Sequence, residues 1–400
     1  MSVKLNAVCE LIVDCPHSTE PDEGRGYPII RTPNIGQGYL DFDGVQRVGQ
    51  EAYDRRNARA IPRPGDLILA REAPAGNVGI IPEGMDVCLG QRTVLIRPSR
   101  DKVNPFYLNY YLNAPKQRHR LLSNANGATV SHVNMPIIRN LPVDLPPLPA
   151  QQRIAGVLST YDKLIENNRR QITLLEEAAQ RLYKEWFVDL RFPGHEATPI
   201  HNGLPEGWKR STVGNLCRTV GGGTPSTKVT SYYDGGNIPW VTPTDVTGNI
   251  GTYLPQTAKM ITEDGLSNSS AKMIPKGSIL MTSRASIGYF AICDRDVCTN
   301  QGFISCISNT DAVKWQLLQN LKTRVAEMKG LAKGSTFLEI SKTAFRAMPI
   351  VMPPDALAER FSSLAQELFS KEVLARRQLE AAREARDRLL PKLMSGEIEV

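Results

Sequence analysis

The chain has 400 residues, 41% of them hydrophobic and 22% charged, a composition typical of a globular protein long enough for two or three domains. Its apolar runs are far shorter than the roughly 18 to 20 residues needed to cross a bilayer, and no secretory signal opens it, so we expect a cytoplasmic protein. Seven scattered cysteines without a Cys-x-x-Cys pair argue against a disulfide framework and structural zinc, and the net charge of +7 alone identifies no partner.

The chain repeats itself. Five landmarks of the first half return in the same order in the second half, with offsets that drift only from 207 to 213. The paired landmarks are Tyr27 to Ile35 with Ile238 to Val246, Ile61 to Arg71 with Ile274 to Arg284, Cys88 to Gln91 with Cys298 to Gln301, Gly127 to Thr129 with Gly334 to Thr336, and Pro142 to Pro147 with Pro349 to Pro354. The sequence therefore predicts two divergent copies of one unit of about 200 residues.

Residues 1–148 are predicted to form the first globular domain. Short alternating runs such as Asp66 to Ala70, in a segment rich in Gly, Pro, Val, Ile and Thr, indicate many short strands in a mixed α/β domain. A helix is expected from Pro105 to about Leu122, opened by proline in its first turn. Asn104 to Tyr107 resembles an amino-methyltransferase motif, but its third residue is Phe and no glycine-rich cofactor loop accompanies it, so the helix start is the better interpretation.

Residues 149–192 are predicted to form a long helix. After Pro146-Pro147, apolar or near-apolar residues recur in alternating steps of four and three, the heptad pattern of helices that wind around a partner. These seam positions are Ile154, Leu158, Tyr161, Ile165, Asn168, Ile172, Leu175, Ala179, Leu182 and Trp186. Adding 207 to each gives a matching seam in residues 355–400, interrupted by the charged Glu372 and Arg386. We expect the two helices to pair with each other; the alternative is that each packs on its own globular domain.

A linker, residues 193–206, leads to the second globular domain, residues 207–354, and then to the second long helix, residues 355–400. Lys and Arg exceed Asp and Glu by seven in 207–354 but by only two in 1–148. In both domains basic residues cluster on the helix before a Gly-x-Thr loop, where small residues allow close approach to a phosphate backbone. We expect phosphate contacts from Lys116, Arg118, Arg120, Lys322, Arg324, Lys329 and Lys333; a solvated basic helix face is the alternative.

No catalytic constellation stands out. Gly221 to Gly223 lacks the Lys-Ser/Thr of a phosphate loop, the five histidines have no HExxH or triad context, and no paired carboxylates are apparent. The sequence argues against intrinsic catalysis, and we expect no catalytic residue, metal site or bound cofactor in this chain.

Several segments, taken together, resemble the specificity subunit of type I restriction-modification systems. The resemblance covers essentially the whole chain and rests on the repeat and on Leu145 to Ile154, Leu182 to Val188, Gly203 to Trp208, Gly222 to Pro225 and Leu390 to Ile398. The weakest match is Met352 to Phe361, where Asp-Ala-Leu-Ala-Glu-Arg-Phe replaces the Gln-Gln-Arg-Ile found at the first boundary.

The resemblance implies an α+β fold in which two target recognition domains are joined by two long helices that form an antiparallel coiled coil, with an internal pseudo-two-fold repeat. Each domain would read one half of a bipartite site in double-stranded DNA. The paired helices would set the spacer and dock two methyltransferase subunits, with endonuclease/translocase subunits as further partners. Adenine methylation would use S-adenosylmethionine bound by the partner methyltransferase subunit.

On this interpretation, base edges would be read by side chains that pair with them through two hydrogen bonds. The candidates are Arg31, Asn34, Arg71, Gln91, Arg92 and His132 in the first domain, and Thr242, Thr244, Asp245, Arg284, Asn300 and Gln301 in the second. Thr129 and Thr336 are expected to contact phosphates, and Trp186, Phe187 and Leu393 to bind a partner subunit. Gln91 and Gln301 could equally satisfy buried backbone groups. The alternatives for the chain as a whole are a stand-alone DNA adenine methyltransferase and a coiled-coil scaffold that does not bind DNA.

Overall fold

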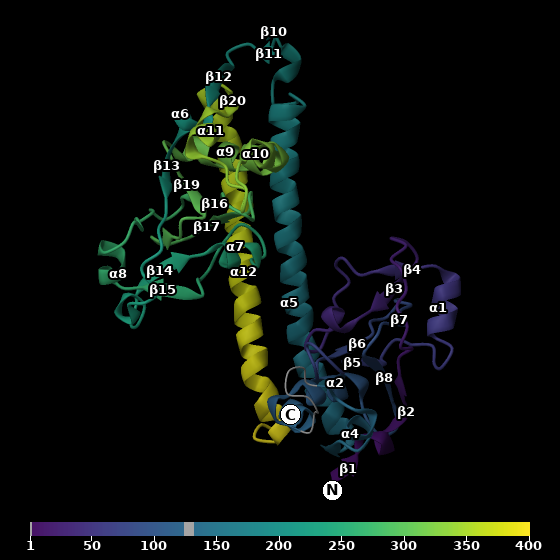
Figure 1. Cartoon of the computed structure of the whole chain (residues 1–400). Coiled ribbons are helices and arrows are strands. Elements are labelled where there is room, and N and C mark those ends of the chain that lie inside the picture. The colour runs from purple at the N-terminus through teal and green to yellow at the C-terminus, as the bar shows by residue number, and fades with distance from the viewer. Residues whose placement is uncertain (1, 124–131) are drawn as a thin grey trace. The chain divides into compact units, whose positions relative to one another are not determined.

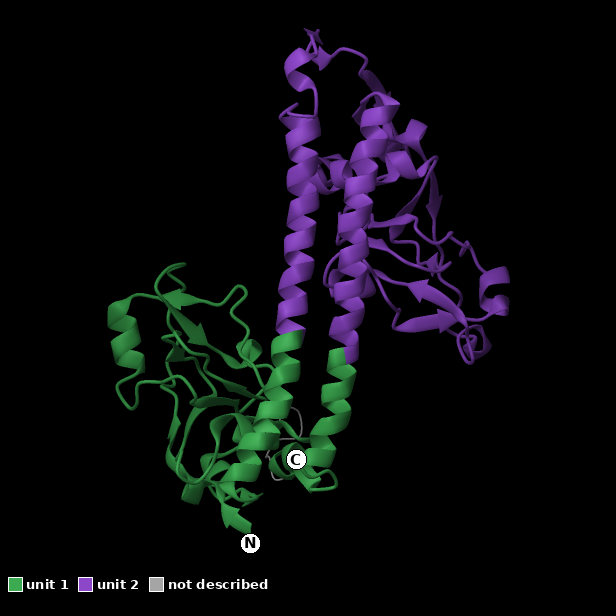
Figure 2. Ribbon diagram, turned by 180° about the vertical axis from the view of Figure 1, so that it is seen from behind, with its two compact units in different colours: residues 1–164, 382–400 green, residues 165–381 purple. Residues whose placement is uncertain are grey.

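The structure is a computed structural model that describes residues 2–123 and 132–400. It divides into two compact units, Met1–Leu164 with Ala382–Val400 (unit 1) and Ile165–Ala381 (unit 2), coloured separately in Figure 2. Each unit contains one mixed α/β domain and segments of two long helices, α5 (Leu148–Tyr183) and α12 (Asp355–Ser395) (Figure 1). None of the helices among the described residues combines the length and hydropathy that crossing a bilayer requires.

Unit 1 contains three small sheets. Their strand orders are β2-β8-β5-β6, β4-β3-β7 and β1-β9, and every neighbouring pair is antiparallel except β3 and β7. The strands are β1 (Ser2–Lys4), β2 (Cys9–Asp14), β3 (Tyr27–Ile30), β4 (Arg47–Val48), β5 (Leu67–Ala70), β6 (Val78–Ile80), β7 (Cys88–Leu89), β8 (Thr93–Pro98) and β9 (Pro142–Asp144). The shorter helices are η1 (Leu5–Val8), η2 (Thr32–Asn34), α1 (Gln50–Arg56), α2 (Pro105–Asn113), α3 (Pro115–Ser123) and α4 (Met135–Arg139).

Unit 2 repeats this topology. Its strand orders are β13-β19-β16-β17, β15-β14-β18 and β12-β20, with one parallel pair, β14 and β18, and an added hairpin β10-β11. The strands are β10 (Ile200–His201), β11 (Leu204–Pro205), β12 (Lys209–Thr212), β13 (Cys217–Gly221), β14 (Ile238–Val241), β15 (Lys259–Ile261), β16 (Ile279–Thr282), β17 (Phe290–Ile292), β18 (Cys298–Thr299), β19 (Phe303–Ser308) and β20 (Pro349–Met352). The shorter helices are η3 (Lys184–Val188), η4 (His195–Ala197), α6 (Val213–Leu216), η5 (Thr230–Tyr232), α7 (Pro243–Thr247), α8 (Glu263–Ser267), α9 (Asp311–Thr323), α10 (Val325–Leu331) and α11 (Lys342–Ala347). The internal repeat expected from the sequence is therefore confirmed.

The helix expected from Pro105 to about Leu122 is present but consists of two pieces. Asn104 caps α2 by accepting a hydrogen bond from the Tyr107 amide at 3.0 Å, and Pro105 occupies the first turn, as the sequence predicts. The helix then breaks at Ala114, because Pro115 has no amide to donate and forces the preceding residue into an extended conformation. The equivalent helix of unit 2 also breaks, at Arg324, between α9 and α10.

The heptad seam packs as predicted. In unit 1, Ile154 and Leu158 of α5 share a buried cluster with Leu393 of α12. In unit 2, Tyr183 at the end of α5 shares a cluster with Phe361 and Ala365 at the start of α12. The segments of α5 and α12 lie side by side in both views and run antiparallel within each unit (Figures 1 and 2). Each fully buried Leu or Ile contributes roughly 1.5–3 kcal/mol, so the seam is a major source of stability in both units.

The two charged residues that interrupt the second seam have partners. In unit 1, the Arg386 guanidinium pairs with the Asp162 carboxylate of α5 at 2.7 Å, and the same carboxylate accepts a hydrogen bond from the Tyr110 hydroxyl of α2. In unit 2, the Glu372 carboxylate accepts the Thr252 and Tyr253 amides at 2.6 and 2.7 Å. Both charged residues thus link the helix pair to the globular domain of their unit.

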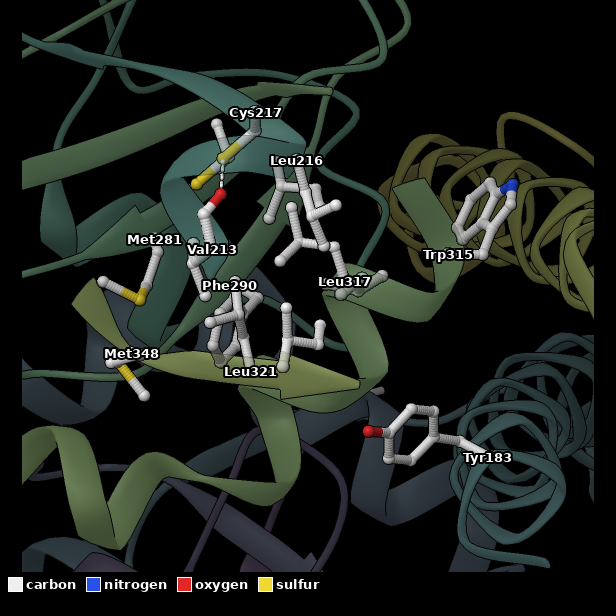
Figure 3. Packing of buried hydrophobic residues seen from close by; sticks show 14 of the residues in the cluster. Tyr183, Val213, Leu216, Cys217, Met281, Phe290, Trp315, Leu317, Leu321 and Met348 are labelled. Carbon is white, nitrogen blue, oxygen red and sulfur yellow. Dashed lines mark hydrogen bonds between the residues drawn. The ribbon is translucent and has the colours of Figure 1, made fainter. Parts of the chain in front are cut away.

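The core of unit 2 joins its sheet to both long helices. Figure 3 shows part of this cluster, with Val213, Leu216, Phe290 and Leu321 packed together. The buried Cys217 thiol donates to the Val213 carbonyl at 3.5 Å. This packing makes the β16–β19 sheet a fixed platform for the loops that leave its edge.

Candidate nucleic-acid interface

Five of the predicted base-reading residues lie together at one edge of unit 1, which we call the corner: Arg31, Arg71, Gln91, Arg92 and His132. The Arg71 amide, just after β5, donates to the Arg92 carbonyl before β8 at 2.8 Å, and the Val133 amide donates to the Arg71 carbonyl at 3.0 Å. The Gly90 amide ties the same loop to the Ile30 carbonyl at 2.7 Å, which places Arg31 and Gln91 beside it. Four segments distant in sequence thereby present their side chains at one edge.

The polar side chains of this corner form a chain of ion pairs and hydrogen bonds. Arg71 is buried, and its guanidinium contacts the Asp14 carboxylate at 2.7 Å, the Val133 carbonyl at 2.9 Å and His132 Nε2 at 2.7 Å. His132 Nδ1 lies 2.7 Å from one Glu72 oxygen, and Arg92 Nε lies 2.9 Å from the other. Since Glu72 accepts at Nδ1 and Arg71 donates at Nε2, the neutral His132 ring is held in a single tautomer.

Arg92 and Arg71 therefore occupy different positions in the network. The Arg92 side chain is 62% exposed and leaves the backbone from a left-handed conformation, φ 63°. Its Nε is held by Glu72, and among residues 2–123 and 132–400 its two terminal nitrogens have no hydrogen-bond partner, so they can face a ligand. Arg71 is buried and each of its three guanidinium nitrogens has a partner within unit 1, so it holds the corner together. Base reading by Arg71 stays a prediction.

The other candidates of the first domain have mixed placements. The Asn34 side chain is buried and accepts the Arg31 amide at 3.2 Å, so it caps η2. Gln91 is half-buried and donates to the His17 carbonyl at 3.0 Å in an exposed hydrogen bond. Arg31 is half-buried, and its Nε is buried without a hydrogen-bond partner. Thr129 lies outside the described residues.

Unit 2 builds the same corner with different side chains. The Ser283 amide donates to the Gly302 carbonyl at 2.8 Å, and the Ile340 amide donates to the Ser283 carbonyl at 3.0 Å. The exposed Arg284 guanidinium lies 3.9 Å from the Glu339 carboxylate and 5.7 Å from the centre of the Phe337 ring.

These hydrogen bonds correct the alignment of the two halves. The sequence pairs Arg71 with Arg284, whereas the backbone contacts pair Arg71 with Ser283, and hence Glu72 with Arg284 and His132 with Glu339. The offset at this point is one residue smaller than the sequence landmarks suggest, because the strand edge and not the shared arginine fixes the register. The equivalent pair is therefore Glu72 with His132 in one domain and Arg284 with Glu339 in the other, with the charges exchanged.

The remaining candidates of the second domain fall into two groups. Thr242 and Asp245 form a capping box on α7: the Asp245 carboxylate accepts the Thr242 hydroxyl at 2.6 Å and also the Ala258 amide at 2.8 Å. Asn300 accepts the Gly302 amide at 3.0 Å within its own loop. The exposed residues are Thr244, Gln301, whose amide oxygen accepts the Thr224 hydroxyl, and Thr336. We conclude that Thr242 and Asp245 support the fold.

Several basic residues expected on phosphates are bound within their own unit. Lys322 is largely buried and pairs with the Glu176 carboxylate at 2.8 Å, and Arg324 pairs with Glu327 at 2.6 Å. Arg118 is half-buried, donates to Asn77, and has a pKa lowered by that burial. Lys116, Lys329 and Lys333 remain exposed. Sequence position on a basic helix did not show that Arg118, Lys322 and Arg324 have partners within their own unit. Their phosphate contacts stay a prediction.

The residues expected to bind a partner subunit also lie inside the chain. After α5 the backbone continues as the π-helical turn η3, which turns Trp186 and Phe187 onto Phe361 of α12, with ring centroids 5.8 and 4.8 Å away. Trp186 is buried, Phe187 is half-buried against Trp208 as well, and Leu393 is buried in the core of unit 1. Trp186 and Leu393 are thus covered within their own units, and Phe187 is covered in part. Partner binding by these three residues stays a prediction, for which Phe187 has the most exposed side chain.

The sequence analysis missed Glu72, Asp14, Phe337 and Leu338. Glu72 follows Arg71 directly at the end of an alternating run, so a shift of one residue in the repeat alignment could have found it. Phe337 and Leu338 directly follow Gly334-Ser-Thr336, a landmark of the repeat from which only a phosphate contact by Thr336 was predicted. Among the residues that the structure describes, no three His, Cys, Asp or Glu side chains gather in a way that could hold a metal ion.

Comparison with known proteins agrees with this architecture. The profile of the family described as "Type I restriction modification DNA specificity domain" matches residues 1–177 and again 205–366. The chain is 26% identical over 417 residues to the putative type I restriction enzyme MjaX specificity subunit of Methanocaldococcus jannaschii, which covers 99% of this chain and 93% of that protein. It is 24% identical to the MjaIX specificity subunit of the same organism, with coverage of 89% and 83%.

A solved structure shares the fold. The crystal structure of a type I restriction-modification system S subunit from M. genitalium superposes with a TM-score of 0.61 at 15% identity and covers 98% of this chain and 95% of that one. The twofold match of the family profile coincides with the duplicated topology of the two units. The chain belongs to the family of type I restriction-modification DNA specificity subunits.

Proposed function

We propose that each globular domain of this specificity subunit reads one half of a bipartite DNA site through the corner described above. The domains of residues 1–148 and 207–354 would contact different half-sites. This proposal is supported by one backbone framework that is built twice with different side chains. The first domain has the exposed Arg92 held by the half-buried Glu72, and the second has the exposed Arg284 and Glu339.

The hydrogen-bonding character of these side chains supports the proposal. An arginine can donate two parallel hydrogen bonds to O6 and N7 of guanine, whereas a carboxylate accepts from the exocyclic amine of cytosine. At one equivalent position the corner of unit 1 has a hydrogen-bond acceptor, Glu72, and the corner of unit 2 has a donor, Arg284. The two half-sites should therefore differ at the base pair that this position faces.

The long helices have a separate role in this proposal. The antiparallel pairing of α5 and α12 would fix the number of unread base pairs between the half-sites and provide the docking surface for two methyltransferase subunits. Those subunits would bind S-adenosylmethionine and methylate adenine, and endonuclease subunits would join the same complex in the cytoplasm. This chain would supply sequence recognition and no catalytic group.

Methylome sequencing of cells with and without the gene tests the proposal. We expect a bipartite motif, two short specified half-sites separated by an unspecified spacer, to carry N6-methyladenine only when the gene is present. A methylation pattern that is unchanged on deletion, or a lost motif that is contiguous, would contradict the proposal.

A further inference from the structure

A short hairpin at the corner of unit 2, from Lys333 to Glu339, has two exposed apolar residues, Phe337 and Leu338. Backbone hydrogen bonds close the hairpin in both directions between Lys333 and Glu339, at 3.0 and 2.9 Å. Gly334 makes the turn possible: its φ is +141°, and a Cβ there would lie 2.2 Å from the Phe337 carbonyl oxygen. The chain between these residues is thus held in one tight conformation.

The hairpin is anchored to the sheet platform. Ile340, directly after it, is buried and hydrogen-bonded to Ser283, and the Ala285 amide donates to the Leu338 carbonyl at 2.9 Å. The neighbouring Ser283 is bonded in turn to Gly302, beside the exposed Gln301. The hairpin therefore stands at the corner with Arg284 and Gln301 and is fixed to it on both sides.

The hairpin exposes apolar side chains next to the positively charged side chains of lysine and arginine residues. Phe337 is 55% exposed and Leu338 is 50% exposed. Lys333 and Lys329 are exposed on the segment leading into the hairpin, and the Arg284 guanidinium lies over the Phe337 ring. Two large apolar side chains with such exposure are costly in water unless a partner covers them.

We propose that Phe337 and Leu338 form a wedge that inserts between neighbouring base pairs of the DNA bound by the second domain and kinks it there. This inference rests on the proposed function and adds a deforming contact to the base-reading contacts. Apolar wedges on a rigid support, flanked by side chains that contact phosphates, are a common means by which proteins unstack a base step. The flanking cations favour a polyanion over a protein surface as the occupant.

The wedge is expected in one half of the chain only. By the offset of 207 that relates Gly334-Ser-Thr336 to Gly127-Ala-Thr129, the counterparts of Phe337 and Leu338 are Val130 and Ser131, which lie outside the described residues. A valine followed by a serine offers much less apolar volume than Phe followed by Leu. The kink should therefore be centred in the half-site read by the second domain.

A gel-mobility bending assay tests this inference. The probes are circularly permuted duplexes that carry the bipartite site returned by methylome sequencing, and the protein is the full chain with its copurifying subunits. We expect the wild type to bend the DNA by tens of degrees, with the bend centre inside the half-site whose preference Arg284→Ala relaxes. Phe337→Ala with Leu338→Ala should lose most of the bend and bind about fivefold or more weakly, whereas Phe337→Trp should keep it.

Met273→Ala, at another exposed apolar residue of unit 2, is the matched control and should leave the bend unchanged. An unbent complex of wild-type protein, a bend that survives the double substitution, or a bend centred in the other half-site would overturn the wedge while leaving sequence recognition intact. Loss of copurifying subunits with the double variant would overturn it too, because the apolar pair would then cover a protein surface. Absence of any sequence-specific DNA binding by the wild type would instead refute the proposed function itself.

Discussion

Arg71 and Arg92 show how far the sequence identifies a functional side chain. The repeat marked both arginines, but only the contacts show that all three nitrogens of the Arg71 guanidinium bind within unit 1, to Asp14, Val133 and His132, while Arg92 faces outward. A sequence shows which residues have hydrogen-bond donors, but it does not show how many of these donors are already bonded within the protein. The same limit made Thr242 and Asp245, which form a helix cap, look like base readers.

Arg92→Ala and Arg284→Ala should each relax base preference in one half-site, and in opposite halves. Loss of a donor that forms two hydrogen bonds with guanine lowers discrimination by about 1–3 kcal/mol, or roughly five- to hundredfold, at a single base pair. Methylome sequencing of each variant strain would show the relaxed position directly. Glu72→Gln should relax the same position as Arg92→Ala more weakly, because Glu72 holds Arg92 Nε.

Arg55→Ala is the control for these variants, since Arg55 is exposed in the first domain but pairs with Glu20, away from the corner. It should leave both half-sites unchanged. A uniform loss of methylation at all sequences in Arg92→Ala would identify that side chain as a phosphate contact.

Glu372 should make the stability of unit 2 depend on pH. Burial in the seam, with Glu176 adding repulsion, raises the pKa of Glu372 from 4.5 to about 7; Lys322 and the Arg376 guanidinium also face it. Because the folded protein holds this proton more tightly than the unfolded chain, the contribution of Glu372 to stability is fully present below pH 4.5 and is lost as the pH rises to about 7, by roughly 3 kcal/mol. Urea denaturation between pH 5 and 8 should show this loss for the wild type and much less of it for Glu372→Gln, whose amide oxygen can still accept both backbone amides.

Glu367→Gln offers a matched comparison on the same helix. Its exposed carboxylate pairs with Lys371 at 2.7 Å, which lowers the pKa of Glu367. This variant should keep the pH dependence of the wild type. Equal slopes for the wild type and Glu372→Gln would show that Glu372 does not carry the effect.

The long helices are the elements that the sequence predicts best. Seam residues such as Leu158, Ile172 and Leu379 are buried, because a heptad period depends only on local spacing. The π-helical turn after α5 and the break at Arg324 were not predictable in this way, since both depend on contacts with distant residues such as Phe361 and Pro349. The burial of Trp186 against Phe361 was not predictable for the same reason.

A matched deletion of one heptad from both helices, residues 165–171 and 376–382, should change the spacer alone. Removal of seven residues shortens a helix by about 10 Å, the length of about three base pairs. Because one whole heptad is removed, the remaining seam residues still lie on the same side of the helix. We expect methylation of the same half-sites at a shorter spacing, or loss of methylation, in methylome data. Altered half-site bases would argue against a spacer role.

Deleting residues 165–171 alone is the control for the matched pair. It removes one heptad from the α5 seam, Ile165 and Asn168 included, and leaves the α12 seam unchanged, so the two seams no longer match in length. This variant should lose both thermal stability and methylation.

At the scale of the whole chain, the duplicated fold was predictable from the sequence, whereas the role of the net positive charge was not. The excess of seven positive charges in residues 207–354 remained ambiguous in sequence, and the structure shows that Lys322 and Arg324 within it are bound internally. The repeat itself, the fold class and the long helices followed from sequence landmarks. The alignment at the corner did not, because landmarks such as Arg71 and Arg284 conserve a residue type without conserving its place on the strand edge.

The exposed lysines of the second domain should account for part of the salt dependence of DNA binding. Each phosphate neutralised contributes about 0.9 to the slope of log affinity against log salt concentration. Replacing Lys329 and Lys333 with Gln should lower this slope by about 2 in fluorescence anisotropy titrations with the bipartite duplex. Lys371→Gln, which removes an equally exposed lysine paired with Glu367 on α12, should leave it unchanged, and equal slopes for all three proteins would contradict the assignment.

The division into units also sets an order of assembly during synthesis. Unit 1 draws its core from both Met1–Leu164 and Ala382–Val400, with Leu393 among its buried residues, whereas unit 2 is the continuous segment Ile165–Ala381. A ribosome therefore delivers every residue of unit 2 before the last strip of unit 1 exists. The domain made first is therefore the one completed last, and until then Ile154 and Leu158 lack the packing that Leu393 provides.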